Sequence, residues 1–422
     1  MYNRLRQFNS YHTPVFPPAV VTSGSAAGEQ PVKLIRICLL ALMAGSLWAC
    51  LGLGLYAIIP ALGNLIYLGR FSMEPFDVYY SGIGPIIILL PIMATALWLW
   101  LKQKSKMVNP FALIGMSATG IPLGLENVLS YLCSFGLRNN NSRLTHKEGN
   151  ILIMTGIAGA ITWCFGTPLA AIACCIELFL TEISLASILP LLISVAATTA
   201  LQYYLNPQAY DLIITNSDEY TLLWLYGIIG MVCALLAGLY RYVYLRTQQQ
   251  VISLHNKKQW LLLIPALVVG LVIWYYPESY GPGNNYLVPL LHGAVTFKVI
   301  LLICFGRYLC SLFYNSTAMI GSSVTTMLII GASWGLLTGF IFQLCFPQLH
   351  VSSTMIALAG MAAFLTGSTR AVITALIFTI EMSHSAQVLP AVSIACAAAY
   401  GTTYLLSVRK IRTSLLAAGN EF

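Results

Sequence analysis

The sequence predicts an all-α polytopic membrane protein, built as a bundle of tilted and broken helices in two repeated halves. Hydrophobic residues make up 58% of the 422 residues and charged residues only 8%. The mean hydropathy is +0.79, and no soluble domain needs so much apolar sequence. Several apolar segments are too long for one span of about 20 residues and too short for two. Tilted helices and half-helices are therefore expected.

The apolar segments give the expected elements in chain order. The first contains Pro60, which suits a tilted helix with a bend, and the second ends at Trp98, Trp100 and Lys102, an aromatic and basic anchor at the membrane interface. The segments are 34 to 68, 83 to 101, 111 to 135, 151 to 181, 185 to 203, 221 to 240, 259 to 275, 297 to 314, 324 to 346, 354 to 382 and 387 to 406.

The distribution of charge predicts the orientation. The net charge of +8 does not indicate nucleic-acid binding, because the basic residues sit in short connections between apolar runs. Basic residues from Arg241 to Lys258 and from Arg409 to Arg412 are predicted to be cytosolic, whereas Glu74 and Asp77 are predicted to lie outside. Both termini are expected in the cytosol, and the protein is expected in a bacterial-type inner or plasma membrane. We expect a disordered tail at 1 to 32, a transmembrane domain at 33 to 408 and a short cytosolic C-terminus at 409 to 422.

Cysteines and histidines give no sign of a metal site, a cofactor or an enzyme. The eleven cysteines contain no C-x-x-C pair and lie mostly within apolar segments, as small packing residues do. The six histidines are dispersed, and no paired carboxylates or Ser/His constellation appears.

A glycine-punctuated break with a single carboxylate lies within segment 111 to 135. Gly120, Pro122 and Gly124 interrupt the apolar run, and a new helix can start at Leu125, just before Glu126. A charge at the bilayer centre costs about 2.5 to 3.5 kcal/mol on insertion scales, so such a carboxylate indicates function. The N-terminus of a broken helix binds anions. The alternative is a carboxylate that caps a helix start near the interface.

The chain repeats itself 204 residues later. Gly156 matches Gly360, and Glu177 matches Glu381. Duplicated halves are typical of transporters with inverted repeats, whose ligand site lies between the halves. The halves are predicted at about 33 to 204 and 220 to 408, and Glu177 and Glu381 are interpreted as capping or pairing residues.

A second polar break runs from Asn315 to Thr326 in the second half. A half-helix N-terminus rich in hydroxyl donors would bind an anion. The alternative is a helix lined with small residues for close packing.

These motifs together resemble the CLC family of chloride channels and proton-coupled chloride exchangers, from about residue 34 to 418. The similar stretches are Thr155 to Glu177, with its Phe-x-x-Pro-Leu-Ala element, and Ala357 to Met382. The stretch Gly124 to Val128 (GLENV) is similar to the family's G-[KR]-E-G-P element. The resemblance implies an inverted-repeat fold, a homodimer with one pore in each subunit, and Glu126 as the gating glutamate.

Two stretches mimic family motifs without filling their roles. His146-Lys147-Glu148 lies too close to Thr155 and in a charged loop, and Thr119 to Pro122 mimics the S-G-I-P selectivity motif. The chain between Lys106 and Glu126 is about thirty residues shorter than in the family, and the selectivity motif itself is expected to be lost or degenerate.

Other positions depart from the family pattern. Val324 and Thr326 replace the phenylalanine and proline of its G-x-F-x-P element. Arg412 occupies the position that corresponds to the family's pore tyrosine, and it is interpreted either as a pore-facing or as an interfacial residue. Leu178 follows Glu177 where exchangers usually have a second glutamate, while channel members have an apolar residue. No pair of CBS domains is expected.

Transmembrane transport of chloride or a related anion is therefore expected, with a passive channel favoured. The alternatives are an exchanger of protons for anions, or a non-conducting scaffold or degenerate paralogue. Acid should stimulate transport, because burial disfavours the ionised form of Glu126. The lipid bilayer and, under the exchange alternative, protons complete the expected partners, without nucleic acid. The predicted anion-binding residues are Gly124, Leu125, Glu126, Asn127, Val128, Gly321, Ser322, Ser323, Val324 and Thr325.

Overall fold

The computed structural model describes residues 34–104, 109–139, 145–180, 183–205, 222–254, 259–318, 323–348 and 351–419. All regular secondary structure in this part of the chain is helical. The α-helices are α2 (Leu34–Leu68), α3 (Leu89–Lys104), α4 (Asn109–Ala118), α5 (Leu125–Asn139), α6 (His146–Phe165), α7 (Pro168–Cys174), α8 (Leu185–Leu205), α9 (Leu223–Leu254), α10 (Leu263–Tyr275), α11 (Asn284–Leu291), α12 (Phe297–Leu302), α13 (Tyr308–Ala318), α14 (Val324–Cys345), α15 (Ser353–Thr369), α16 (Val372–Ser383) and α17 (Leu389–Gly419).

Short 3₁₀ and π turns join or extend these helices. The π turns η5 (Cys175–Phe179) and η9 (Ile303–Arg307) continue α7 and α12. The 3₁₀ turns are η2 (Val78–Tyr80), η3 (Gly84–Ile88), η7 (Gln259–Leu262), η8 (Pro277–Ser279) and η10 (Ala386–Val388).

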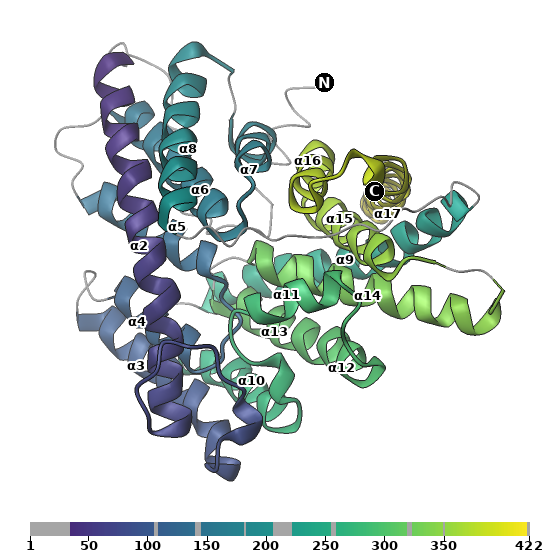
Figure 1. Cartoon of the computed structure of the whole chain (residues 1–422), viewed down its shortest axis with the longest axis horizontal. Helices are drawn as coiled ribbons and strands as arrows, with labels where there is room; N and C mark the ends of the chain where they lie inside the picture. The colour runs from purple at the N-terminus through teal and green to yellow at the C-terminus, as the bar shows by residue number, and fades with distance from the viewer. Residues whose placement is uncertain are drawn as a thin grey trace.

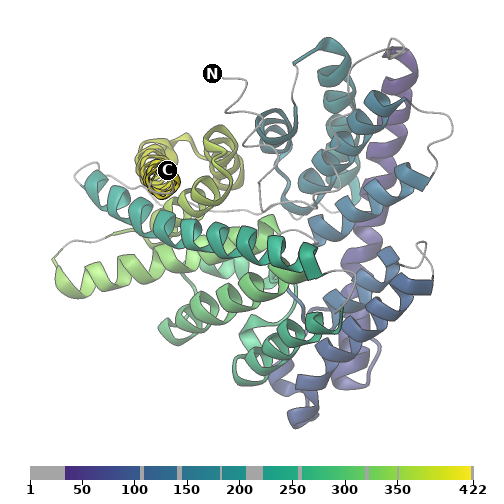
Figure 2. The ribbon, with the colours of Figure 1, turned by 180° about the vertical axis from the view of Figure 1, so that it is seen from behind.

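The two halves of the chain pack as two helix groups. Along one side, α2 lies against α8 and α6, and α5 lies against α6 (Figure 1). On the other side, α14 packs on α15, and α9 packs on both α15 and α17, as the view from behind also shows (Figure 2). The two groups meet where α7 lies against α16 and α3 lies against α10, and the starts of α5 and α14 are also in contact.

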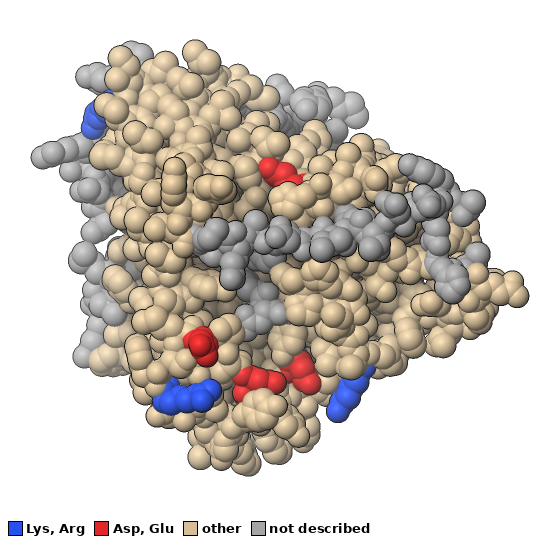
Figure 3. Space-filling view, in the orientation of Figure 1, with Lys and Arg blue, Asp and Glu red and all other residues tan. Residues whose placement is uncertain are grey.

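Eight helices in the described part of the chain are long and apolar enough to cross a membrane. The prediction of broken helices is confirmed at three segments. Segment 111 to 135 is divided between α4 and α5, segment 151 to 181 between α6 and α7, and segment 354 to 382 between α15 and α16. The face shown in Figure 3 carries few charged side chains, and most of these lie at its lower end.

The predicted duplication extends to the backbone. Helix α6 ends at Gly166 with φ +67°, and the Gly166 N–H donates to the Thr162 carbonyl at 2.8 Å. Helix α15 ends 204 residues later at Arg370 with φ +65°, and the Arg370 N–H donates to the Thr366 carbonyl at 2.7 Å. A left-handed arginine is costly. It is tolerated here because the chain must turn sharply from α15 into α16, just as it turns at Gly166 from α6 into α7.

Glu177 and Glu381 each cap the helix of the other half. Glu381 accepts from the N–H groups of Leu169 and Ala170, at 2.8 and 2.7 Å, at the start of α7. Glu177 accepts from the N–H and hydroxyl of Thr374, both at 2.9 Å, at the start of α16. Carboxylates stabilise helix N-termini because they satisfy unpaired N–H groups and complement the dipole. The predicted capping role of both residues is thereby confirmed.

Small residues allow α14 and α15 to approach closely. A Cβ added to Gly360 would lie 2.4 Å from the Gly331 carbonyl oxygen, and one added to Gly335 would lie 2.7 Å from the Ile356 carbonyl oxygen. Such contacts are typical of helix pairs in membranes. Close packing by small residues is therefore a feature of the body of α14, C-terminal to the second polar break.

Candidate functional site

The connection between α4 and α5 turns sharply just before Glu126. Gly124 has φ +68°, and a Cβ at this position would lie 2.5 Å from the Ser323 Cβ and 2.7 Å from the Glu126 Oε1. Only glycine combines this backbone conformation with so close an approach. Gly124 therefore brings the start of α5 against the start of α14.

Glu126 is completely buried at this junction. Its Oε1 accepts from the Thr325 N–H at 2.9 Å, and its Oε2 accepts from the Thr325 hydroxyl at 2.7 Å. Thr325 lies in the first turn of α14, where N–H groups lack partners within the helix. The carboxylate thus occupies the position in which an external anion would meet the same donors.

Ser323 organises the start of α14. It is the N-cap residue, and its Oγ accepts from the Thr326 N–H at 3.0 Å. Ser323 therefore caps α14, whereas Thr325 donates hydrogen bonds to Glu126. The hydroxyl-rich helix start predicted here is present, but α14 has 22 residues, so it is a full-length helix and not a half-helix.

The structure brings most of the predicted anion-binding residues together. Leu125 to Val128 form the first turn of α5, and Gly124, Ser323, Val324 and Thr325 lie at the facing junction, all of them buried. Gly321 and Ser322 lie outside the described residues. Arg412 lies in the C-terminal part of α17, and its side chain is outside the description.

Both motif mimics have structural roles. Glu148 is the third residue of α6, and its carboxylate accepts from the Thr145 N–H at 3.0 Å in a capping box. The segment 119 to 124 is the connection that leads to Glu126. The Tyr67 hydroxyl donates to the Thr119 carbonyl at 3.0 Å, and the Gly281 N–H donates to the Gly120 carbonyl at 3.1 Å. Sequence reasoning missed these distant donors.

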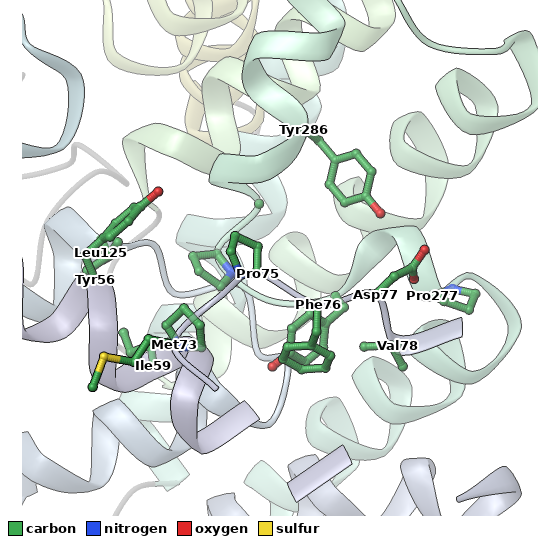
Figure 4. A pocket seen from close by; sticks show the side chains of 14 residues that line it. Tyr56, Ile59, Met73, Pro75, Phe76, Asp77, Val78, Leu125, Pro277 and Tyr286 are labelled. Carbon is green, nitrogen blue, oxygen red and sulfur yellow. The ribbon is translucent and has the colours of Figure 1, made fainter. Parts of the chain in front are cut away.

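A cavity of about 490 Å³ opens at the start of α5. Figure 4 shows Leu125 at one side of the view and Asp77 at the other, with Phe76 between them and Tyr286 pointing in from α11. Leu125 directly precedes Glu126, so the cavity reaches the residue next to the buried carboxylate. Burial, reinforced by the charges of Asp77 and Glu278, raises the pKa of Tyr286 to about 12, and its hydroxyl therefore stays neutral. No local sequence pattern signals this cavity, because distant loops form it.

A second cavity is lined in part by Val324, the first residue of α14. Its volume of about 10 Å³ is close to that needed for one water molecule. Leu178, which is 7% exposed, lines it together with Thr374, the residue that holds Glu177. An apolar side chain therefore borders the space between Thr374 and the start of α14.

Comparison with known proteins gives a consistent result. The family model described as "Voltage gated chloride channel" matches residues 101–404. The H(+)/Cl(-) exchange transporter ClcA of Citrobacter koseri is 27% identical over 380 residues, which cover 85% of this chain and 78% of that protein. ClcA of Vibrio cholerae is 26% identical over 340 residues, covering 76% and 70%.

Two solved structures share the fold. A slow cyanobacterial Cl-/H+ antiporter superposes with a TM-score of 0.75 and 18% identity, covering 93% of this chain and 99% of that one. A CLC-type fluoride/proton antiporter superposes with a TM-score of 0.70 and 20% identity, covering 89% and 97%. Since the family match extends over most of the chain and the helices follow the same fold, this multi-pass integral membrane protein belongs to the CLC family of voltage-gated chloride channel proteins.

Proposed function

We propose that this protein exchanges a small inorganic anion of the chloride type for protons across a membrane, with Glu126 as its gate. The contact of Glu126 with Thr325 carries the proposal, because it places a protonatable group on the donors that an anion would use. The similar curated proteins are named H(+)/Cl(-) exchange transporters. These names favour exchange over the passive channel that the sequence suggested.

The two ions compete for one set of donors. Ionised Glu126 accepts both hydrogen bonds from Thr325 and blocks the start of α14. Protonation weakens these bonds, since charged acceptors bind about twice as strongly as neutral ones. The carboxyl can then leave, and an anion can accept from the Thr325 N–H and hydroxyl. Binding of a proton and binding of an anion are thus coupled at one site.

A passive channel remains the second candidate, and Leu178 is the observation that favours it. Its side chain offers no proton acceptor, and the neighbouring Glu177 is engaged at the start of α16. Under the exchange proposal, protons pass this region through water and the threonine hydroxyls at the small cavity.

Anion and proton fluxes measured together distinguish these candidates. Liposomes that carry the purified protein and a chloride gradient are recorded for chloride release and external pH, for the wild type, Glu126→Gln and Glu126→Ala. Exchange predicts uphill proton movement in the wild type and anion flux without proton movement in both variants. Wild-type chloride flux without protons would establish the channel. The absence of flux from folded protein, with chloride, fluoride and nitrate all tested, would establish the non-conducting alternative.

We further propose a homodimer with one transport path in each subunit and cytosolic termini in a bacterial-type plasma membrane. Cross-linking in native membranes and accessibility of single cysteines placed at the termini test these assignments. A monomer or external termini would contradict them.

A further inference from the structure

Arg307 is a fully buried cation without an ion-pair partner. It lies in the π turn η9, its side chain is 1% exposed, and it forms no salt bridge within the described residues. Its Nη2 donates to the carbonyl oxygens of Gly281, at 3.0 Å, and Pro282. These carbonyl groups hold one end of the guanidinium but carry no full negative charge.

The other donors of this guanidinium are unused. Nε and Nη1 are buried and have no hydrogen-bond partner in the described part of the chain. A guanidinium has five N–H groups, so Nε and Nη1 together leave three without an acceptor. Buried charges are expected to be paired, and an unsatisfied buried group points to water or to an ion.

The guanidinium lies directly behind the wall of the 490 Å³ cavity. Pro282, Gly283 and Tyr286 belong to the lining. A Cβ added to Gly283 would lie 2.3 Å from the Cζ, Nη1 and Nη2 atoms of Arg307, so the guanidinium packs directly against Gly283, which is itself part of the cavity lining. Figure 4 shows the Tyr286 ring on this lining, directed into the cavity.

Arg307 also acts on the gate. Its charge attracts the Glu126 carboxylate, though less strongly than the hydrogen bonds from Thr325 do. When Glu126 is protonated, this attraction disappears and the buried cation has no compensating charge. Two other nearby carboxylates do not replace Glu126: neither Asp77, which lines the cavity, nor Glu278, which does not, forms an ion pair with Arg307 among the described residues. Asp77 instead accepts from the Tyr79 N–H at 3.0 Å.

We propose that Arg307 binds a small monovalent anion at the inner end of this cavity, at a site separate from the Glu126–Thr325 contact. The anion accepts hydrogen bonds from the free Nε and Nη1 donors and compensates the buried charge. The anion stays bound at this site until protonated Glu126 leaves the start of α14. The role in the transport cycle rests on the proposed exchange function, whereas anion binding at Arg307 is tested without it.

Bromide anomalous scattering from crystals of the full chain gives the direct test. Crystals of Glu126→Gln are grown in bromide, with and without Arg307→Met. We expect an anomalous peak within hydrogen-bonding distance of Arg307 Nε or Nη1 that Arg307→Met removes, while a peak at Thr325 remains. Density that is filled by water alone at Arg307, beside a bromide at Thr325, would overturn the proposal whatever the flux assays show.

Two further variants keep the test decisive if Arg307→Met does not fold. Arg307→Lys keeps the charge and should retain a shifted peak. Gly283→Ala adds a methyl group where the guanidinium lies and should displace or remove the peak. If both variants fold and leave the bromide where it is in Glu126→Gln alone, Arg307 does not hold it.

The flux assay supplies a second readout. Arg307→Lys should raise the half-saturating anion concentration by roughly 10-fold when the anion is supplied on the cavity side of the membrane. This factor corresponds to the loss of about 1.4 kcal/mol, close to one hydrogen bond to a charged group. The half-saturating concentration on the opposite side of the membrane should be unchanged. Arg246→Lys is the matched control, because it makes the same substitution at an exposed residue that lies over the Tyr242 ring. An equal change on both sides, or an equal effect of Arg246→Lys, would contradict the site.

Discussion

Glu126 and Thr325 are 199 residues apart in the chain, yet the carboxylate of the first accepts hydrogen bonds from both the backbone and the side chain of the second. Each residue lies in the first turn of its helix, and the helices belong to different halves of the chain. Neither half alone contains both the carboxylate and its donors. The proposed gate is therefore a property of the interface between halves.

The Thr325 hydroxyl should hold the gate closed at neutral pH. Thr325→Val removes one of two hydrogen bonds to the carboxylate and keeps the shape of the side chain, and a bond to a charged group contributes about 1.5 to 3 kcal/mol. We expect chloride efflux at pH 7 and saturating chloride to rise by roughly 10-fold or more. The control is Thr338→Val, which removes a hydroxyl bonded within the same helix to Trp334. Equal efflux from both variants would show that this bond does not restrain Glu126.

A side chain at Gly124 should prevent the two helix starts from meeting. Gly124→Ala combines a left-handed backbone with a Cβ only 2.5 Å from Ser323, and we expect thermal destabilisation together with loss of flux per folded protein. Gly136→Ala is the matched control in α5, because nothing lies within 4 Å of its added Cβ and alanine favours a helix by about 0.5 to 1 kcal/mol. Thermal unfolding and flux are measured on the same preparations. Full activity of Gly124→Ala would rule out the close junction.

The pH response should follow Glu126 and not Glu148. Flux through the wild type should increase as pH falls, because protonation releases Glu126 from Thr325. Glu126→Gln should make the flux independent of pH, whereas Glu148→Gln should preserve the pH response, because a glutamine can still accept from the Thr145 N–H in the capping box. Efflux between pH 4.5 and 7.5 checks both variants. A flat profile for Glu148→Gln would reverse the assignment of the two glutamates.

The reciprocal caps should stabilise the fold without taking part in gating. Glu177→Gln and Glu381→Gln each replace a charged acceptor by a neutral amide, and each should lower the stability by about 1 to 2 kcal/mol. The double variant should lose the sum, since separate sites are usually additive. Glu74→Gln, at an exposed position, serves as the control. Thermal unfolding in detergent measures these changes, and stability equal to the wild type in both variants would show that the caps contribute nothing.

Much of the site could be predicted because its signals are local. Glycine and proline around Glu126 mark a break, hydroxyl residues before Val324 mark a helix start, and the 204-residue repeat places the two in equivalent halves. The apolar segment 324 to 346 predicted the full length of α14 (Val324–Cys345), but its polar beginning alone suggested a half-helix, since a hydroxyl-rich start suits a short or a long helix. Arg307, Tyr67 and the lining of the large cavity were missed because their roles depend on contacts between residues far apart in sequence. The choice between channel and exchanger could not be read from Leu178, because one apolar position does not define a proton route.

The reciprocal caps also constrain how the protein is made. The N–H groups at the start of α7 emerge from the ribosome long before Glu381, which lies 212 residues after Leu169. Until that carboxylate is synthesised and inserted, the first half holds a helix start with unsatisfied donors in an environment that penalises them. The amino-terminal half should therefore remain incompletely assembled during translation, and co-expressed halves should rescue each other where neither is stable alone.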